Sequence, residues 1–208
     1  MQNTSHAVMS QRHEPILSDD NFPTPPWATR ALLLYGIPYD NFHIQSCLEP
    51  ACGDGHMAKV LQTYFNSVDA FDVNEKYGYE RRNFLTSNYK NYDWVITNPP
   101  FNFAEKFIHK ALTIADRGVA ILARTTFLES VGRFERLFNS TPPTIFAQFV
   151  ERVPMVKGRL DKNATTATGY AWFIWLKSLP NLSPKLVWIP PCRKQLERGE
   201  DYNNVERR

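Results

Sequence analysis

The stretch that determines the fold is residues 48–58, which read LEPACGDGHMA. The apolar run at residues 44–48 has the length of a buried strand, and an apolar segment with helical spacing covers residues 57–65. Glycine allows tight turns and lets the backbone come close to a ligand, so Gly53 and Gly55 predict a ligand-binding turn at the carboxyl end of that strand.

The acidic residues around this turn bear on the kind of ligand. Gly53, Gly55 and Ala58 fit a loose dinucleotide-binding fingerprint, and an ordinary strand–helix turn would also explain them. Glu49 favours a ligand with a cationic group, because a carboxylate repels a pyrophosphate. Asp72 follows Gly55 by 17 residues, at the end of a second strand-like run. A carboxylate there can accept hydrogen bonds from both hydroxyls of a ribose, although a helix cap or a surface acid is the alternative.

Strand-like runs alternate with helical segments along most of the chain. We expect strands over residues 44–48, 68–73, 92–97, 118–123, 144–153 and 170–176, and helices over residues 28–35, 57–65, 103–115 and 130–138. This alternation predicts an α/β fold with a mostly parallel sheet and helices on both faces. A polar connection of 16 residues without a helix joins the last two strands, which predicts a hairpin and an antiparallel strand at one edge of the sheet. Thr24 is the expected N-cap of the first helix.

The composition excludes several classes of protein. A chain of 208 residues with 43% hydrophobic and 22% charged residues can form one domain with a real core, and it is neither disordered nor fibrous. No apolar run is long enough to cross a membrane, and the N-terminus lacks a secretory signal. The 3 cysteines form no CxxC pair and the 5 histidines show no ligand spacing, so we predict no disulfide framework and no metal, and we expect a cytoplasmic protein.

The sharpest chemical signal is Asn98-Pro99-Pro100-Phe101, directly after the strand expected at residues 92–97. The two prolines stiffen the turn and remove two backbone donors, which leaves the Asn98 side-chain oxygen and the Pro99 carbonyl as acceptors. Two acceptors can hold both hydrogens of a planar exocyclic amine and direct its lone pair toward an electrophile. The Phe101 ring can then stack on the base. A simple turn, which Asn-Pro-Pro also predicts, would explain neither the ring nor the glycine-rich loop.

Together these motifs resemble those of class I S-adenosylmethionine-dependent methyltransferases. The resemblance is to the amino-methylating group that includes DNA adenine-N6 methyltransferases, and in particular to its small, phage-type members with an NPPF motif. Residues 49–55 match the acidic-P-x-x-G-x-G cofactor loop, and residues 98–101 match the catalytic tetrapeptide. Phe22, Thr24 and Pro25 match a Phe-x-Thr-Pro segment that contacts the methionine part of the cofactor. The order of the motifs is that of the gamma-type adenine enzymes.

The resemblance implies a single Rossmann-like methyltransferase domain over residues 19–190. Its sheet would be mostly parallel and seven-stranded, with one antiparallel strand. A mobile segment, residues 1–18, is expected before this domain and a charged tail, residues 191–208, after it. The implied cofactor is S-adenosyl-L-methionine. The implied catalytic residues are Asn98, Pro99, Pro100 and Phe101. The residues expected to bind the cofactor are Phe22, Thr24, Pro25, Glu49, Pro50, Ala51, Gly53, Gly55, Asp72, Val73, Asn83 and Phe84. The family usually has Asp where Asn83 stands.

Charge is unevenly distributed along the chain. Residues 1–100 carry 7 Lys and Arg against 11 Asp and Glu, a net charge of −4, whereas residues 101–208 carry 17 against 10, a net charge of +7. The basic half favours a phosphate-bearing partner, with an unevenly charged but inert surface as the alternative. The residues expected to contact nucleic acid are Arg124, directly after the strand expected at residues 118–123, and Lys157, Arg159 and Lys162, in the connection between the last two strands. A solvated hairpin tip would also explain the last three.

The expected activity is methyl transfer from S-adenosyl-L-methionine to the N6 amine of adenine in DNA, in the cytoplasm of a bacterial or phage-infected cell. The alternatives are the same reaction on RNA adenine or on a protein glutamine amide, and a non-catalytic subunit that binds nucleic acid. A nicotinamide oxidoreductase would leave NPPF unexplained. Only 107 residues follow Phe101, and the fold needs them. Selectivity must then come from loops, from a protein partner or a second copy in a homodimer, or be weak.

Overall fold

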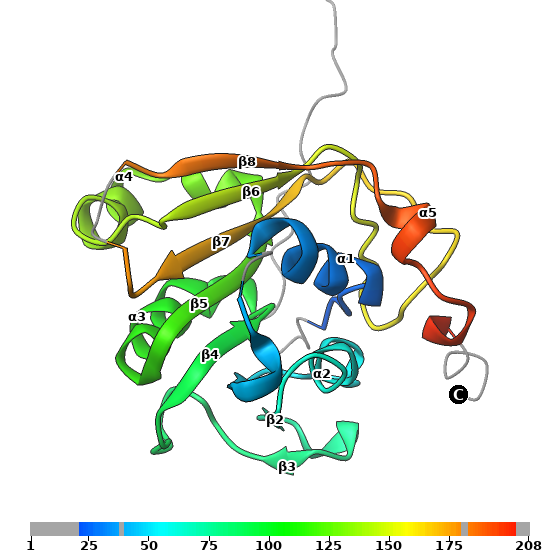
Figure 1. The fold of residues 1–208 in the computed structure, drawn as a ribbon, viewed down its shortest axis with the longest axis horizontal. Helices are drawn as coiled ribbons and strands as arrows, with labels where there is room; N and C mark the ends of the chain where they lie inside the picture. The colour runs from blue at the N-terminus through cyan, green and yellow to red at the C-terminus, as the bar shows by residue number, and fades with distance from the viewer. Residues whose placement is uncertain (1–20, 38–39, 180–182, 203–208) are drawn as a thin grey trace, which may run out of the picture.

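The computed structural model describes residues 21–37, 40–179 and 183–202, so the segment expected to be mobile, residues 1–18, lies outside the described residues. The described part forms one eight-stranded sheet in the order β3-β2-β1-β4-β5-β7-β6-β8 (Figure 1). The strands are β1 (Ser46–Glu49), β2 (Ser67–Asp72), β3 (Glu80–Arg81), β4 (Tyr92–Thr97), β5 (Ala115–Arg124), β6 (Ile145–Phe149), β7 (Tyr170–Leu176) and β8 (Lys185–Ile189).

The mostly parallel sheet is confirmed, with two corrections. Strand β7 is antiparallel to both of its neighbours, β5 and β6, and all other pairs are parallel. The predicted hairpin between β6 and β7 is present, but β7 lies inside the sheet and not at its edge. The sheet has eight strands where seven were expected, and its edge strands are β3 and β8. β3 gives almost no sequence signal because it has only two residues, both exposed, and β8 is a short apolar run whose Leu186 and Trp188 stay exposed at the edge of the sheet.

Helices cover both faces of the sheet (Figure 1). On one side lie α1 (Pro26–Ala31), which continues as a π-helical turn (Leu32–Gly36), and α2 (His56–Leu61). On the other side lie α3 (Ala104–Ile114) and α4 (Val131–Arg133), which continues as a second π-helical turn (Phe134–Phe138). No helix among the described residues is both long and apolar enough to span a bilayer.

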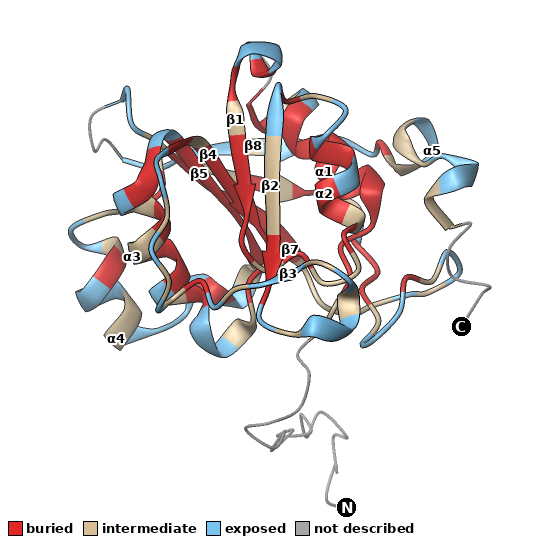
Figure 2. Cartoon of the chain, turned by 90° about the horizontal axis from the view of Figure 1, so that it is seen from below, coloured by how far each residue is buried: buried red, intermediate tan, exposed pale blue. Residues whose placement is uncertain are grey.

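Alternate residues of the central strands supply two hydrophobic cores. In β5, Ala120 and Leu122 face the core beneath α1, whereas Val119 and Ile121 face the core beneath α3. Figure 2 shows the resulting buried centre of the sheet. A parallel sheet that is buried on both faces needs nearly continuous apolar strands, which is the pattern that residues 118–123 carry.

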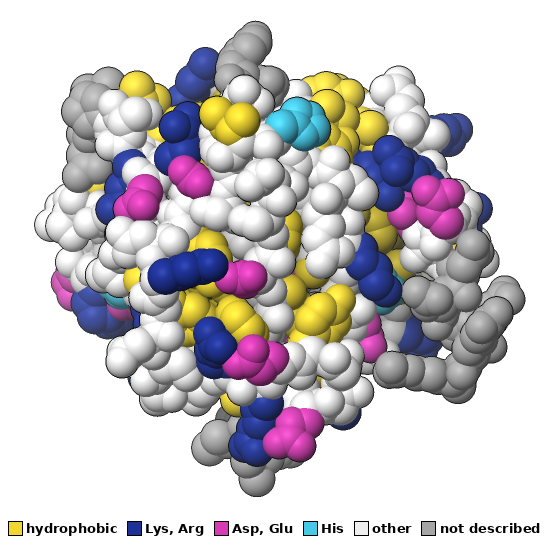
Figure 3. All heavy atoms as spheres, turned by 60° about the horizontal axis from the view of Figure 1, so that its bottom comes forward, with side chains coloured by type: hydrophobic (Ala, Val, Ile, Leu, Met, Phe, Trp, Pro, Cys, Tyr) yellow, Lys and Arg dark blue, Asp and Glu magenta, His cyan; other side chains and the backbone are white. Residues whose placement is uncertain are grey.

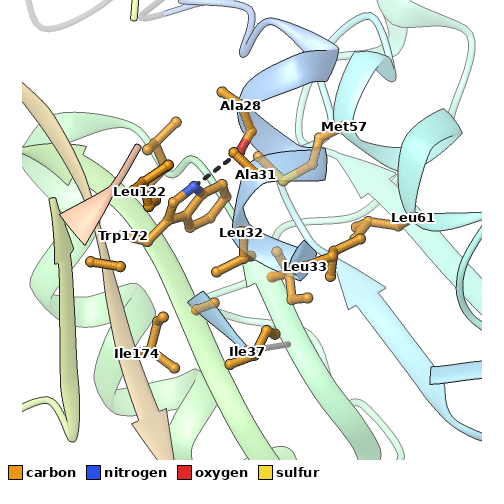
Figure 4. Close-up of a cluster of buried hydrophobic side chains, with 14 of the residues drawn as sticks. Ala28, Ala31, Leu32, Leu33, Ile37, Met57, Leu61, Leu122, Trp172 and Ile174 are labelled. Carbon is orange, nitrogen blue, oxygen red and sulfur yellow. Dashed lines mark hydrogen bonds between the residues drawn. The ribbon is translucent and has the colours of Figure 1, made fainter. Parts of the chain in front are cut away.

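Helix α1 is fixed to the sheet and to the end of the described chain. The indole nitrogen of Trp172, in β7, donates to the Ala28 carbonyl oxygen at 3.2 Å (Figure 4). Arg30 forms a bidentate ion pair with Asp201, at 2.7 and 2.8 Å, and both side chains are almost fully buried. Residues 191–202, from the expected charged tail, therefore include a short helix, α5 (Arg193–Leu196), and a buried contact with α1.

Candidate functional site

A cavity of about 1010 Å³ lies where the loops after β1, β2 and β4 converge. In an α/β sheet, ligands bind at the carboxyl ends of the strands, at the point where the strand order reverses, which here falls between β1 and β4. The cavity is lined by twelve of the residues predicted from the sequence: Phe22, Thr24, Glu49, Pro50, Ala51, Gly53, Asp72, Val73, Asn83, Phe84, Asn98 and Pro100. The other four predicted residues do not line the cavity: they are Pro25, Gly55, Pro99 and Phe101.

The glycine-rich turn has the backbone conformation that its sequence predicts. Gly53 and Gly55 have φ angles of +50° and +75°, in the left-handed region that favours glycine. A Cβ on Gly55 would lie 1.8 Å from the hydroxyl oxygen of Tyr79, so this ring packs directly on the turn. Tyr79 is a site residue that the sequence analysis missed, because a tyrosine in a polar stretch gives no signal of such a contact.

Replacing Gly55 with alanine should destabilise the protein more than the same change at Gly78. Gly78 has a similar φ of +77°, but a Cβ added there would have no described atom within 4 Å. The variant Gly78→Ala therefore measures the cost of the backbone strain alone. That strain costs about 1–2 kcal/mol. Gly55→Ala carries the same strain and must also displace Tyr79. Urea unfolding of both variants measures the difference, and equal losses of stability would show that Tyr79 yields without cost.

Two buried carboxylates, those of Glu49 and Asp72, line the cavity. Glu49 is 2% exposed and Asp72 is 8% exposed. The Oε2 atom of Glu49 is buried without a hydrogen-bond partner among the described residues. Burial, and then the charge of Asp72, raise the pKa of Glu49 well above its ordinary value. A cationic group placed beside Glu49 would therefore be strongly stabilised, since it would relieve this repulsion.

Glu49→Gln should stabilise the free protein increasingly as the pH rises. The folded state holds the Glu49 proton more tightly than the unfolded chain, whose glutamate has the ordinary pKa of 4.5. The contribution of this carboxyl to stability is thus complete below that pH and is lost as the pH rises through the raised, folded-state pKa. Urea unfolding from about pH 5 to about pH 8 tests this, with Glu129→Gln at an exposed position as the control. A constant difference between wild type and Glu49→Gln over that range would contradict the expectation.

Asn98 stands at the end of β4 and is held by groups far away in sequence. Its Nδ2 atom donates to the Phe22 carbonyl oxygen at 2.9 Å and to the Thr24 hydroxyl at 3.1 Å, and it lies 3.8 Å from the sulfur of Met155. Its Oδ1 atom is buried without a partner among the described residues. Thr24 is not the N-cap of α1, as the sequence suggested, because the cap is Pro25 and the threonine hydroxyl accepts from Asn98 instead.

The Phe101 ring is covered in this structure. The Phe22 ring lies 5.3 Å away, centroid to centroid, and the Arg124 guanidinium lies 4.0 Å from the Phe101 centroid. The Nε atom of Arg124 is buried without a partner among the described residues. Beside this pair is a small cavity of about 140 Å³, which Pro99 also lines. The two residues predicted to contact a base and a nucleic acid thus contact each other, and the Arg124 guanidinium occupies a place over the Phe101 ring where a base could stack.

The basic connection between β6 and β7 reaches the rim of the main cavity. The Gly158 amide donates to the Asn21 carbonyl oxygen at 2.7 Å. Of the three basic residues predicted to contact nucleic acid, Arg159 forms an ion pair with Asp161 at 3.2 Å, and the Lys162 ammonium lies 5.9 Å from the Tyr202 ring centroid. Lys157 also interacts within the chain. Figure 3, turned toward the β2–β3 side, shows basic and acidic side chains interspersed around apolar patches.

The segment after β3 contributes less polar surface than its sequence suggests. The Oδ1 atom of Asn83 accepts from the Leu85 amide at 2.9 Å and so closes a local turn. Phe84 is 2% exposed and packs against Phe107, with ring centroids 4.8 Å apart. Val73, by contrast, is 55% exposed at the cavity and offers an apolar surface to a ligand. Among the described residues, no three His, Cys, Asp or Glu side chains are grouped so as to hold a metal ion.

Comparison with solved structures identifies the fold. A proposed class I S-adenosylmethionine-dependent methyltransferase from Listeria monocytogenes matches with a TM-score of 0.55 and 12% identity, over 85% of this chain and 68% of that chain. A proposed RNA methyltransferase from Pyrococcus horikoshii matches with a TM-score of 0.57 and 17% identity, over 79% of this chain and 90% of that chain. A type I restriction-modification methyltransferase subunit from Streptococcus thermophilus matches with a TM-score of 0.57 and 11% identity, over 88% of this chain and 50% of that one, so this chain spans half the length of that subunit.

The chain therefore has the fold of the class I S-adenosylmethionine-dependent methyltransferases. No family model and no curated protein matches its sequence. At such low identities the likeness concerns the architecture, and the chemistry has to be argued from the site itself.

Proposed function

We propose that the protein transfers a methyl group from S-adenosyl-L-methionine to the exocyclic N6 amine of adenine in DNA. The observation that carries this proposal is the Oδ1 atom of Asn98, which is buried without a partner in the described part of the chain. It lies directly after β4, beside a cavity that two buried acids also line. An unpartnered buried acceptor costs about 1–3 kcal/mol unless a ligand donates to it. An amine supplies that donor.

The residues of the cavity fit the proposed cofactor. Glu49 has a buried carboxylate oxygen that no described group hydrogen-bonds, and this oxygen suits a cationic group. Asp72 stands at the end of β2, where a carboxylate can accept from the ribose hydroxyls, and Val73 gives an apolar surface for the adenine. When bound, S-adenosyl-L-methionine supplies an electrophilic methyl group.

Asn98 and the carbonyl of Pro99 hold and orient the acceptor amine in this proposal. Each accepts one hydrogen of the amine, which directs the nitrogen lone pair toward the methyl group. The displacement is direct, and the amine proton then passes to solvent, so no nucleophilic side chain is needed. Phe101 stacks on the base once the Arg124 guanidinium has moved off its ring.

DNA is the proposed polymer because the fold matches a restriction-modification methyltransferase subunit and the second half of the chain is basic. The match to a proposed RNA methyltransferase favours RNA adenine as the second candidate. A protein partner or a second copy of this chain would be the source of sequence selectivity, if selectivity is strict.

Quantifying N6-methyladenine tests the proposal. DNA and RNA are digested to nucleosides from cells that express the wild type or Asn98→Ala, which serves as the blank. An increase in DNA that depends on Asn98 supports the proposal, and an increase confined to RNA selects the second candidate. An absence of increase in both, with soluble protein that binds S-adenosyl-L-methionine, would exclude both adenine acceptors and leave an amide as the acceptor to test.

A further inference from the structure

The amide of Asn98 has both of its hydrogens occupied by the segment that precedes α1. The Nδ2 atom donates to the Phe22 carbonyl oxygen at 2.9 Å and to the Thr24 hydroxyl oxygen at 3.1 Å, and the sulfur of Met155 is a third, more distant acceptor at 3.8 Å. A backbone carbonyl can only accept, so the nitrogen of the amide, and not its oxygen, must face Phe22. The orientation of the amide is therefore determined by the surrounding groups.

We propose that Thr24 is a positioning residue, which holds the Asn98 amide so that it offers only an acceptor to the substrate. This inference rests on the proposed transfer to an amine. With both N–H groups engaged, Oδ1 is the one polar atom of the side chain that remains for a ligand. An acceptor in that place selects a group that donates a hydrogen bond, such as an amine, over a carbonyl oxygen or a ring nitrogen.

The position of Thr24 is itself fixed from several sides. Its side chain is buried, and it is followed directly by Pro25, the N-cap of α1, and by Pro26, the first residue of that helix. The neighbouring Asn21 accepts from the Gly158 amide at 2.7 Å, and its own amide lies 3.4 Å from the carboxylate of Asp54. The segment of residues 21–25 thus connects the glycine-rich turn, the NPPF turn and the basic connection, and Thr24 is the point at which it meets Asn98.

Thr24→Val and Thr24→Ser separate this role from cofactor binding. Valine keeps the shape but removes the acceptor, so kcat should fall about tenfold, the value of one lost hydrogen bond, with the dissociation constant for S-adenosyl-L-methionine nearly unchanged. Serine keeps the hydroxyl and should restore most of kcat. Thr29→Val is the matched control, because Thr29 is equally buried and its hydroxyl has no partner among the described residues. Its kcat should equal that of the wild type.

A second measurement does not depend on activity. The side-chain amide protons of Asn98, assigned by their loss in Asn98→Ala, should exchange slowly in the wild type and in Thr24→Ser. They should shift and exchange faster in Thr24→Val, whose thermal stability is measured alongside. Should no acceptor be methylated at all, these protons still decide whether Thr24 holds the amide.

Two results would overturn the inference. One is a Thr24→Val variant whose kcat and amide protons match those of the wild type. The other is a variant that loses cofactor affinity while its amide protons are unchanged, because Thr24 would then act on the cofactor alone.

Discussion

Asn98→Ala should lower methyl transfer by about 10²–10³-fold and leave cofactor affinity within a few fold, as expected for the loss of one group that stabilises the transition state. The side chain contributes an acceptor, Oδ1, that is buried and has no other partner among the described residues. Its nitrogen is already engaged with Phe22 and Thr24, so removing the whole side chain also leaves those two groups without a donor. Transfer of a labelled methyl group to mixed-sequence DNA measures the first effect, and calorimetry with S-adenosyl-L-methionine measures the second.

Asn98→Asp is the informative companion. It keeps one oxygen where Oδ1 lies but turns a second oxygen toward the Phe22 carbonyl, which cannot donate. Asn98→Asp should therefore lose activity as well. It would keep activity if Asn98 had only to offer one acceptor. Turnover of Asn98→Ala above one tenth of the wild-type value would mean that Asn98 serves the turn and not the reaction.

Asp72→Ala should produce the largest loss of cofactor affinity. A charged acceptor for the ribose is worth about 1.5–3 kcal/mol. A second reason to expect this loss of affinity is that the two carboxylate oxygens of Asp72 accept from the amides of Gly53 and Asn74, each at 2.8 Å. The same side chain therefore holds the glycine-rich turn, and the alanine variant should lose thermal stability along with affinity. Calorimetry with the cofactor and its demethylated product measures the affinity.

Glu75→Ala is the control for this variant. Glu75 follows Asp72 closely in sequence, but its side chain is 72% exposed and pairs with the equally exposed Arg81. Exposed ion pairs contribute little, so this change should leave both affinity and stability intact. Undiminished affinity in Asp72→Ala, or tight binding of NAD by the wild type, would contradict the cofactor assignment.

The class of fold was predictable because the central strands are buried on both faces. Such strands need runs of apolar residues, and the periodicity of the helices between them is equally local. The order of the strands is not local. Nothing in residues 170–176 indicates that β7 inserts between β5 and β6, because that position depends on pairing with residues about 50 positions earlier. Among the described strands, β8 pairs with β6 alone, and nothing local in its short apolar run, residues 186–189, indicates that it joins the sheet.

The candidate site likewise has features that depend on local sequence and features that depend on contacts between distant segments. Motifs within one turn, such as Gly53 to Gly55 and Asn98 to Phe101, were predicted from their sequence, and their roles in binding and catalysis stay predictions. The contacts between turns were not foreseen. Thr24 was expected as a helix cap and as a cofactor contact, and Arg124 as a nucleic-acid contact. The cap is wrong, the other two roles stay predictions, and the contacts of these residues with Asn98 and Phe101 are additional. These contacts depend on where distant segments come to lie.

The ion pair between Arg30 and Asp201 has a consequence for the order in which the elements fold during synthesis. A nascent chain emerges with α1 first, and its guanidinium, buried in the finished fold, has no counter-ion until residue 201 has been made. Burying an unpaired charge costs several kcal/mol, so α1 should not pack in its final position before residue 201 has been synthesised. Because Thr24 directly precedes Pro25, the N-cap of α1, the Asn98 amide would be fixed only once residue 201 has been made. A partly synthesised chain would thus carry the whole glycine-rich turn and the NPPF motif without being able to use them.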